Sequence, residues 1–128
     1  MSPESVIHFW FNELTPKDHF AKYAALDEAI RARFGATLEA AARCELFAWR
    51  ATPEGRLAEV LVLDQFSRNV YRDTARAFAQ DALALALAQE LVASGQDSSL
   101  PLAQRSFVYM PYMHSESALV HTQAATLF

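Results

Sequence analysis

The stretch LAEVLVLDQFSRNVYR, residues 57–72, decides the fold of this chain. Its first half is apolar, and at about 100° per residue Leu57, Val60, Leu61 and Asp64 share one helix face. A carboxylate on the buried face of an apolar helix must find a partner there or change its protonation state. The nearest candidate partners are the polar residues that follow at once, Gln65, Arg68, Asn69 and Arg72.

Length and composition predict one all-α domain that covers residues 1–128. The chain has 128 residues, of which 52% are hydrophobic. This length is enough for one domain with a hydrophobic core and too short for two domains. Only 3 glycines and 5 prolines are present, and the dominant residues, alanine and leucine, are strong helix formers. No alternating β-branched stretch is long enough for a strand.

Charge and cysteine content exclude several classes of protein. The formal net charge is −4, and the Lys and Arg residues form no run, so neither a nucleic-acid partner nor an anionic membrane surface is expected. The lone cysteine cannot form an intrachain disulfide or a cysteine-rich zinc site, and it favours a reducing compartment. Since no signal peptide precedes the first helix and no apolar run is long enough to span a bilayer, the sequence predicts a cytoplasmic protein.

Apolar periodicity, capping residues and helix breakers predict about six helices. Thr52-Pro53 combines an N-cap with a proline at the first helical position, as does Ser2-Pro3. Thr74 and Ser115 are the expected caps of two later helices, and Pro111 is expected to end or kink the helix between them. The predicted helices cover residues 3–14, 26–42, 53–66, 74–94, 101–111 and 115–128.

The last predicted helix reaches Phe128 in the middle of an apolar stripe. An apolar face needs a partner that covers it. Two interpretations stay open. Residues of a longer natural form can cover this face, or a second subunit covers it, which would make a homodimer through the last helix.

Five segments together resemble one protein family. They are VIHFWF (6–11), WRATPEGRLA (49–58), LDQFSRNVYR (63–72), AFAQD (77–81) and MHSE (113–116). On these segments the chain resembles the DUF924 family of bacterial and plant proteins of unknown function. The resemblance implies antiparallel helix pairs similar to tetratricopeptide-repeat domains, and no established activity. The chain departs from the family at Ser67, where proline is usual, and lacks the helix and the basic, aromatic segment that usually follow Phe128.

The polar residues of the central stretch have a structural and a functional interpretation. Asp64 and Arg68 are spaced i,i+4 and can form a buried ion pair, or Asp64 can line a ligand pocket. Gln65 and Asn69 can bond free backbone groups at a helix end or present their amides to a ligand. The remaining binding candidates, which can clamp an anion or close over the core, are Tyr71 and Arg72.

The segment His114-Ser115-Glu116 is also open to two interpretations. Ser115 can cap the last helix, with Glu116 at the favourable end of the helix dipole. Alternatively, His114 is a general base or metal ligand that Glu116 or Asp64 orients. The pair lacks the i,i+4 histidines of helical zinc sites, and no phosphate loop or dinucleotide fingerprint is present. We therefore assign no metal and no cofactor.

Two function hypotheses follow. The first is a non-catalytic helical domain that binds a protein or peptide, because no complete catalytic set is visible. The second is a small hydrolase or metal-dependent enzyme with a polar site around Asp64, Arg68, His114 and Glu116. Its catalytic candidates are Asp64, His114 and Glu116, and it requires these side chains to converge on one cleft.

Overall fold

The computed structural model describes residues 1–128 as helices joined by turns, with no strand. The helices form six continuous rods, the number that the sequence predicts. Two of these rods include a π-helical turn, so that more than one labelled element belongs to the same rod. In chain order the elements are α1 (Pro3–His8) with η1 (Phe9–Glu13), α2 (Ala24–Ala42), α3 (Pro53–Leu61) with η4 (Val62–Phe66) and α4 (Ser67–Val70), α5 (Asp81–Ala93), α6 (Leu102–His114) and α7 (Ala118–Leu127). Short 3₁₀ turns lie between them at Asp18–Phe20, Phe47–Ala51, Ala75–Phe78 and Gln96–Ser99.

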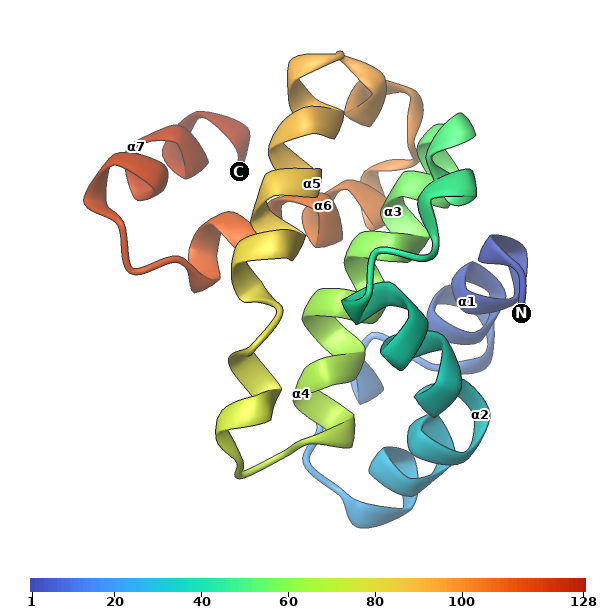
Figure 1. The fold of residues 1–128 in the computed structure, drawn as a ribbon. Coiled ribbons are helices and arrows are strands. Elements are labelled where there is room, and N and C mark those ends of the chain that lie inside the picture. Colours follow the sequence, from blue (N-terminus) through green and yellow to red (C-terminus); the bar gives the residue numbers. More distant parts are fainter.

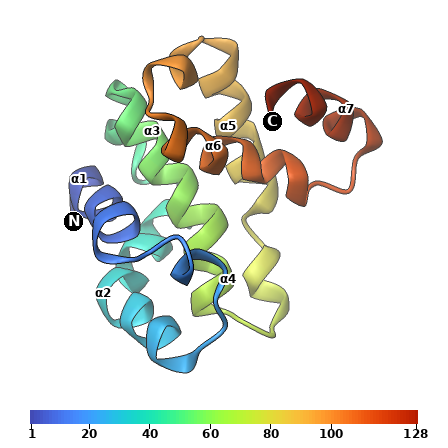
Figure 2. The ribbon, with the colours of Figure 1, turned by 180° about the vertical axis from the view of Figure 1, so that it is seen from behind.

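The rod formed by α3, η4 and α4 runs through the middle of the molecule (Figure 1). Helices α1 and α2 pack on one side of it, and α5 and α6 pack on the other. Helix α7 lies at the outer edge and packs against α6, as the view from behind also shows (Figure 2). Four of the other helices, α1, α2, α5 and α6, are thus arranged around the stretch that begins at Leu57.

The two predicted Pro-containing helix starts are confirmed. The Ser2 side chain accepts a hydrogen bond from the Ser5 N–H in a capping box, and the Thr52 side chain accepts one from the Gly55 N–H at 3.0 Å. Gly55 is required for a second reason, because a Cβ there would lie 1.9 Å from the carbonyl oxygen of Trp49. Close backbone approach of this kind leaves room only for glycine.

The core is one cluster of 25 buried residues. Aromatic rings make up its centre: Phe34 lies 5.0 Å from Phe9 and 5.0 Å from Phe66, between ring centroids. The predicted apolar face of the central helix is fully buried at Leu57, Val60 and Leu61 (each 0% exposed). Each such side chain contributes about 1.5–3 kcal/mol of transfer free energy, so this rod dominates the core.

The predicted end of the central helix at Phe66 is wrong. The rod continues to Val70, because its polar residues find partners from helical positions: Arg68 contacts Asp64, and Asn69 contacts Asp27 on α2. A run of polar residues therefore resembled a loop but is the buried end of a helix.

The predicted cap of the helix over residues 74–94 is also wrong. Thr74 precedes only a 3₁₀ turn, and its hydroxyl donates to the Tyr71 carbonyl oxygen at 2.7 Å instead of capping a helix. Helix α5 starts later, at Asp81. Its end is as predicted, with Gly95 in the left-handed region at φ 75°.

Ser115 does not cap the last helix. Ser117 is the N-cap of α7, and its hydroxyl accepts from the Val120 N–H, whereas the Ser115 hydroxyl accepts from the Ser117 N–H. Helix α6 continues through Pro111, so His114 is its last residue. The structural interpretation of this segment as a helix start therefore does not hold.

Helix α7 buries little of its surface. Ala124 is its one buried residue, while Leu119 and Phe128 are 74% and 59% exposed. No helix of the protein has both the length and the apolar character that crossing a membrane requires.

Candidate functional site

The site begins with an irregularity in the central rod. Residues Val62–Phe66 form a π-helical turn, and all five are buried. A π-helical turn inserts into an α-helix at a cost and is frequent at functional sites. Here it carries Asp64, which is 0% exposed, into the side of the core that faces α5 and α6.

Three side chains donate hydrogen bonds to the Asp64 carboxylate. Gln65 Nε2 lies 3.0 Å from Oδ2, and Arg68 Nη1 lies 3.0 Å from Oδ1. The third donor is Nδ1 of His114, 2.8 Å from Oδ1. A buried carboxylate needs such a complete set of donors, one of them cationic, to remain in a core.

Arg68 extends this network to α5. Its guanidinium forms a bidentate ion pair with Asp81, with Nη1–Oδ1 and Nη2–Oδ2 distances of 2.8 and 3.0 Å. The same group lies 5.3 Å from the centre of the Phe78 ring. One guanidinium thus serves two carboxylates and fixes the start of α5 against the π-helical turn.

His114 connects the network to solvent. Its side chain is 25% exposed and lines an open pocket of about 380 Å³ between the start of α5 and the end of α6. The other lining residues are Phe78, Asp81, Ala82, Leu85, Pro111, Ser115 and Glu116. Because a carboxylate only accepts hydrogen bonds, the hydrogen in the His114–Asp64 contact belongs to Nδ1, which leaves Nε2 of a neutral ring as an acceptor.

The structure separates the predicted site residues into groups. Asp64, Gln65, Arg68 and His114 converge on one network. Glu116 reaches the same pocket but makes no hydrogen bond or ion pair, and it does not orient His114. Asp81, which the sequence pattern did not single out, belongs to the network through its pair with Arg68.

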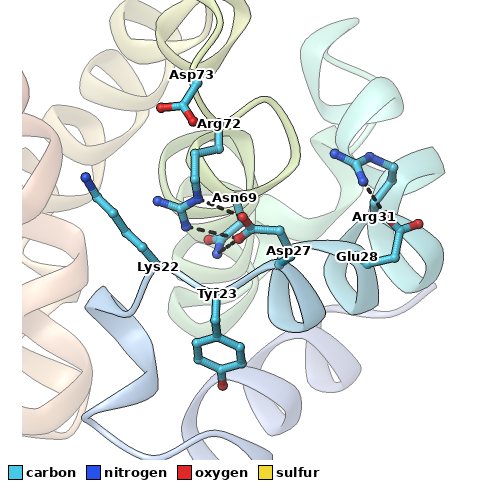
Figure 3. A pocket seen from close by; sticks show the side chains of 9 residues that line it. Lys22, Tyr23, Asp27, Glu28, Arg31, Asn69, Arg72 and Asp73 are labelled. Carbon is cyan, nitrogen blue, oxygen red and sulfur yellow. Dashed lines mark hydrogen bonds and ion pairs between the residues drawn. The ribbon is translucent and has the colours of Figure 1, made fainter.

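Asn69 and Arg72 face a different pocket, next to α2. Asn69 Nδ2 and Arg72 Nε donate to the two carboxylate oxygens of Asp27 at 2.9 and 2.7 Å (Figure 3). This pocket, of about 520 Å³, is also lined by Lys22, Tyr23, Ala24, Glu28, Arg31 and Asp73. Sequence reasoning missed Asp27, because it lies 45 residues before Arg72 and no spacing links the two.

The Asp27 pair is best explained as structural. Burial alone would raise the pKa of Asp27, but hydrogen bonds from Arg72 and Asn69 and the nearby positive charges lower it below its usual value. The neighbouring Arg31 is also occupied, by Glu28 (Figure 3) and by the Val70 carbonyl oxygen. Arg31 and Arg72 therefore hold the end of the central rod against α2.

Tyr71 belongs to neither pocket. Its hydroxyl donates to Glu39 on α2, and Arg76 lies over its ring at 4.0 Å from the centre. Burial and the hydrogen bond to Glu39 raise the pKa of Tyr71. It closes over the core, as one of the two sequence interpretations proposed.

No group of three or more His, Cys, Asp or Glu side chains is placed to share a metal ion. His114 and Asp64 face each other directly. The chemistry that this arrangement offers is proton transfer at the free nitrogen of an oriented imidazole.

Comparison with known proteins identifies the family and the fold. The sequence model described as "Bacterial protein of unknown function (DUF924)" matches residues 6–128. The chain is 37% identical to the protein of unknown function ATU0120 from Agrobacterium tumefaciens, with a TM-score of 0.93, and the match covers 98% of this chain and 70% of that one. No curated protein matches the chain. Since the family match spans nearly all of its residues, the chain belongs to the DUF924 family of bacterial proteins of unknown function.

Proposed function

We propose that this protein is a small acid–base enzyme of the hydrolase type, with His114 as its general base. One observation carries the proposal: Nδ1 of His114 lies 2.8 Å from the buried Asp64 carboxylate, while the same ring lines an open pocket. A carboxylate that accepts from one imidazole nitrogen holds the other nitrogen ready to accept a proton from water or substrate.

Asp64 acts in this proposal as a positioning residue. It fixes the tautomer and direction of the His114 ring and stabilises the imidazolium that forms when the ring takes up a proton. Gln65 and Arg68 hold the carboxylate in turn, and Asp81 holds Arg68. Gln65 and Arg68 belong to the central rod and Asp81 to the start of α5, so the imidazole is fixed before any ligand binds.

The pocket can accept a small ligand next to the imidazole. Its volume of about 380 Å³ falls in the range of small-molecule sites. The nucleophile in the simplest scheme is a water molecule that His114 deprotonates, since the chain contains no Gly-x-Ser-x-Gly motif for a serine nucleophile. The leaving group then takes its proton back from the imidazolium, which restores the neutral ring.

A panel of chromogenic esters, anilides and phosphoesters tests the proposal. We expect His114→Gln to lower kcat by about 100-fold or more for the class that turns over. The matched control is His121→Gln, because His121 is exposed on α7, and it should leave the rate unchanged. Equal rates for His114→Gln and the wild type, or no turnover of any class, would exclude a general-base role.

A second candidate function, the binding of a peptide without catalysis, is favoured by a different surface. An open groove of about 390 Å³ between η1, the 3₁₀ turn at Asp18–Phe20 and α6 is lined by Phe11, Pro16, His19, Phe20, Ala103, Ser106, Phe107 and Met110. Phe20 is 66% exposed there and stacks on Phe107, with ring centroids 6.2 Å apart. Aromatic walls of this kind suit an apolar peptide side chain.

Peptides selected against the immobilised protein test this second candidate. Phe20→Ser should weaken a selected peptide at least tenfold, whereas Leu119→Ser, an equally exposed apolar change on α7, should not. A selection in which no peptide depends on Phe20 counts against it.

A further inference from the structure

Apart from His114 itself, the ionisable side chains that line the pocket are acidic. Among its eight lining residues the charged ones are Asp81 and Glu116, and no Lys or Arg is present among them. The charge of the pocket therefore bears on which class of ligand it can take.

The carboxylates at the pocket differ in their partners. Asp64 and Asp81 share the single guanidinium of Arg68. Glu116 is exposed at the mouth and carries no ion pair or hydrogen bond, in contrast to Glu13, which forms a bidentate pair with Arg33 on another face. Glu116 is therefore the one carboxylate of the pocket lining without a cationic partner, and its negative charge attracts a cation.

The remaining wall suits the rest of such a ligand. Phe78 is 60% exposed and gives the pocket an aromatic surface. Ala82, Leu85 and Pro111 continue this apolar wall along α5 and α6. Apolar surface next to an unpaired carboxylate is the usual arrangement for an amine carried on a hydrocarbon or aromatic body.

We propose that the His114 pocket binds ligands with an ammonium or guanidinium group on an apolar body, which Glu116 recognises and Phe78 supports. The inference rests on the proposed function, because it names the substrate class for the same pocket. It concerns binding, however, and is tested without turnover.

The probe is benzylammonium, compared with benzyl alcohol and benzoate, which share the ring and differ in charge. Binding is followed by the NMR shifts of the His114 ring. Benzylammonium should shift these signals at concentrations at which the other two compounds do not. Glu116→Gln should weaken it about fivefold, the change that loss of one partly exposed ion pair produces. Glu90→Gln, an exposed acid on α5 without a partner, is the matched control and should have no effect.

The outcomes separate the inference from the proposed function. If benzylammonium binding depends on Glu116 but the protein hydrolyses no substrate, the inference about the ligand holds and the proposed hydrolase function is excluded. His114-dependent turnover of neutral or anionic substrates, with no preference for benzylammonium, keeps the enzyme and overturns the inference. Equal binding of benzoate, or an unchanged affinity in Glu116→Gln, also overturns it.

Discussion

His114 donates from Nδ1 to Oδ1 of Asp64 over 2.8 Å, although 50 residues separate them in the chain. The contact joins the end of α6 to the π-helical turn of the central rod, two elements that carry no sequence signal of pairing. Its geometry serves two roles, since it closes the core and orients an imidazole at a pocket.

Asp64→Ala should lower the free energy of unfolding by about 3–5 kcal/mol, because the change leaves Arg68 and two other donors facing an empty site. Urea denaturation measures the loss. Glu90→Ala, which removes an exposed acid, should change stability by no more than about 0.5 kcal/mol. If both variants lose similar amounts of unfolding free energy, the Asp64 network does not hold the helices together.

Asp27→Asn should reduce stability at neutral pH by about 1.5–3 kcal/mol, since it removes the charged acceptor of Arg72 and Asn69. The pKa of Asp27 is lowered by these two donors in spite of burial. Its contribution is therefore present above the ordinary carboxyl pKa of about 4 and lost as the pH falls through the lower folded-state pKa. Unfolding curves at several acidic pH values should show the gap between the wild type and Asp27→Asn closing; a constant gap contradicts the ion pair.

Tyr109→Phe should make stability less sensitive to alkali. Burial and the 2.6 Å hydrogen bond to Asp97 raise the pKa of Tyr109 to about 12. A raised pKa contributes stability that is complete below the ordinary tyrosine pKa of about 10 and is lost as the pH rises towards about 12. Denaturation across this window should show a shallower decline for Tyr109→Phe than for the wild type, and an equal decline would contradict the raised pKa.

Ser67→Ala should stabilise the protein. The Ser67 hydroxyl is buried without a hydrogen-bond partner, which costs about 1–3 kcal/mol. The proline that is usual at this position in the family also has no hydroxyl to satisfy. Thermal unfolding should shift upward for Ser67→Ala and stay within error for Ser106→Ala, which is half-buried. A lower melting temperature for Ser67→Ala would mean that the hydroxyl has a partner.

The elements that could be predicted from the sequence depend on local signals. Ser2 and Thr52 were recognisable as caps because each precedes a proline at the first helical position. The apolar period of Leu57, Val60 and Leu61 identified the buried face, and it placed Asp64 in line with that face before any contact was known. These signals act within one turn of helix and need no knowledge of the tertiary structure.

The remaining features depend on distant partners. The helix end at Phe66 was predicted wrongly because Arg68 and Asn69 look like loop residues until Asp81 and Asp27 are beside them. Ser115 and Ser117 are both capping residues two positions apart, and only the length of α6 decides between them. The single domain, the homodimer through α7 and the cytoplasmic location stay predictions.

The tautomer of His114 tests the central claim most directly. Long-range proton–nitrogen NMR correlations of the neutral ring distinguish a protonated Nδ1 from a protonated Nε2. We expect the hydrogen on Nδ1 in the wild type, with a free Nε2, and a loss of that preference in Asp64→Asn, whose amide can also donate. A wild-type ring that carries its hydrogen on Nε2 would contradict the account, because Asp64 would then not hold the imidazole as a base.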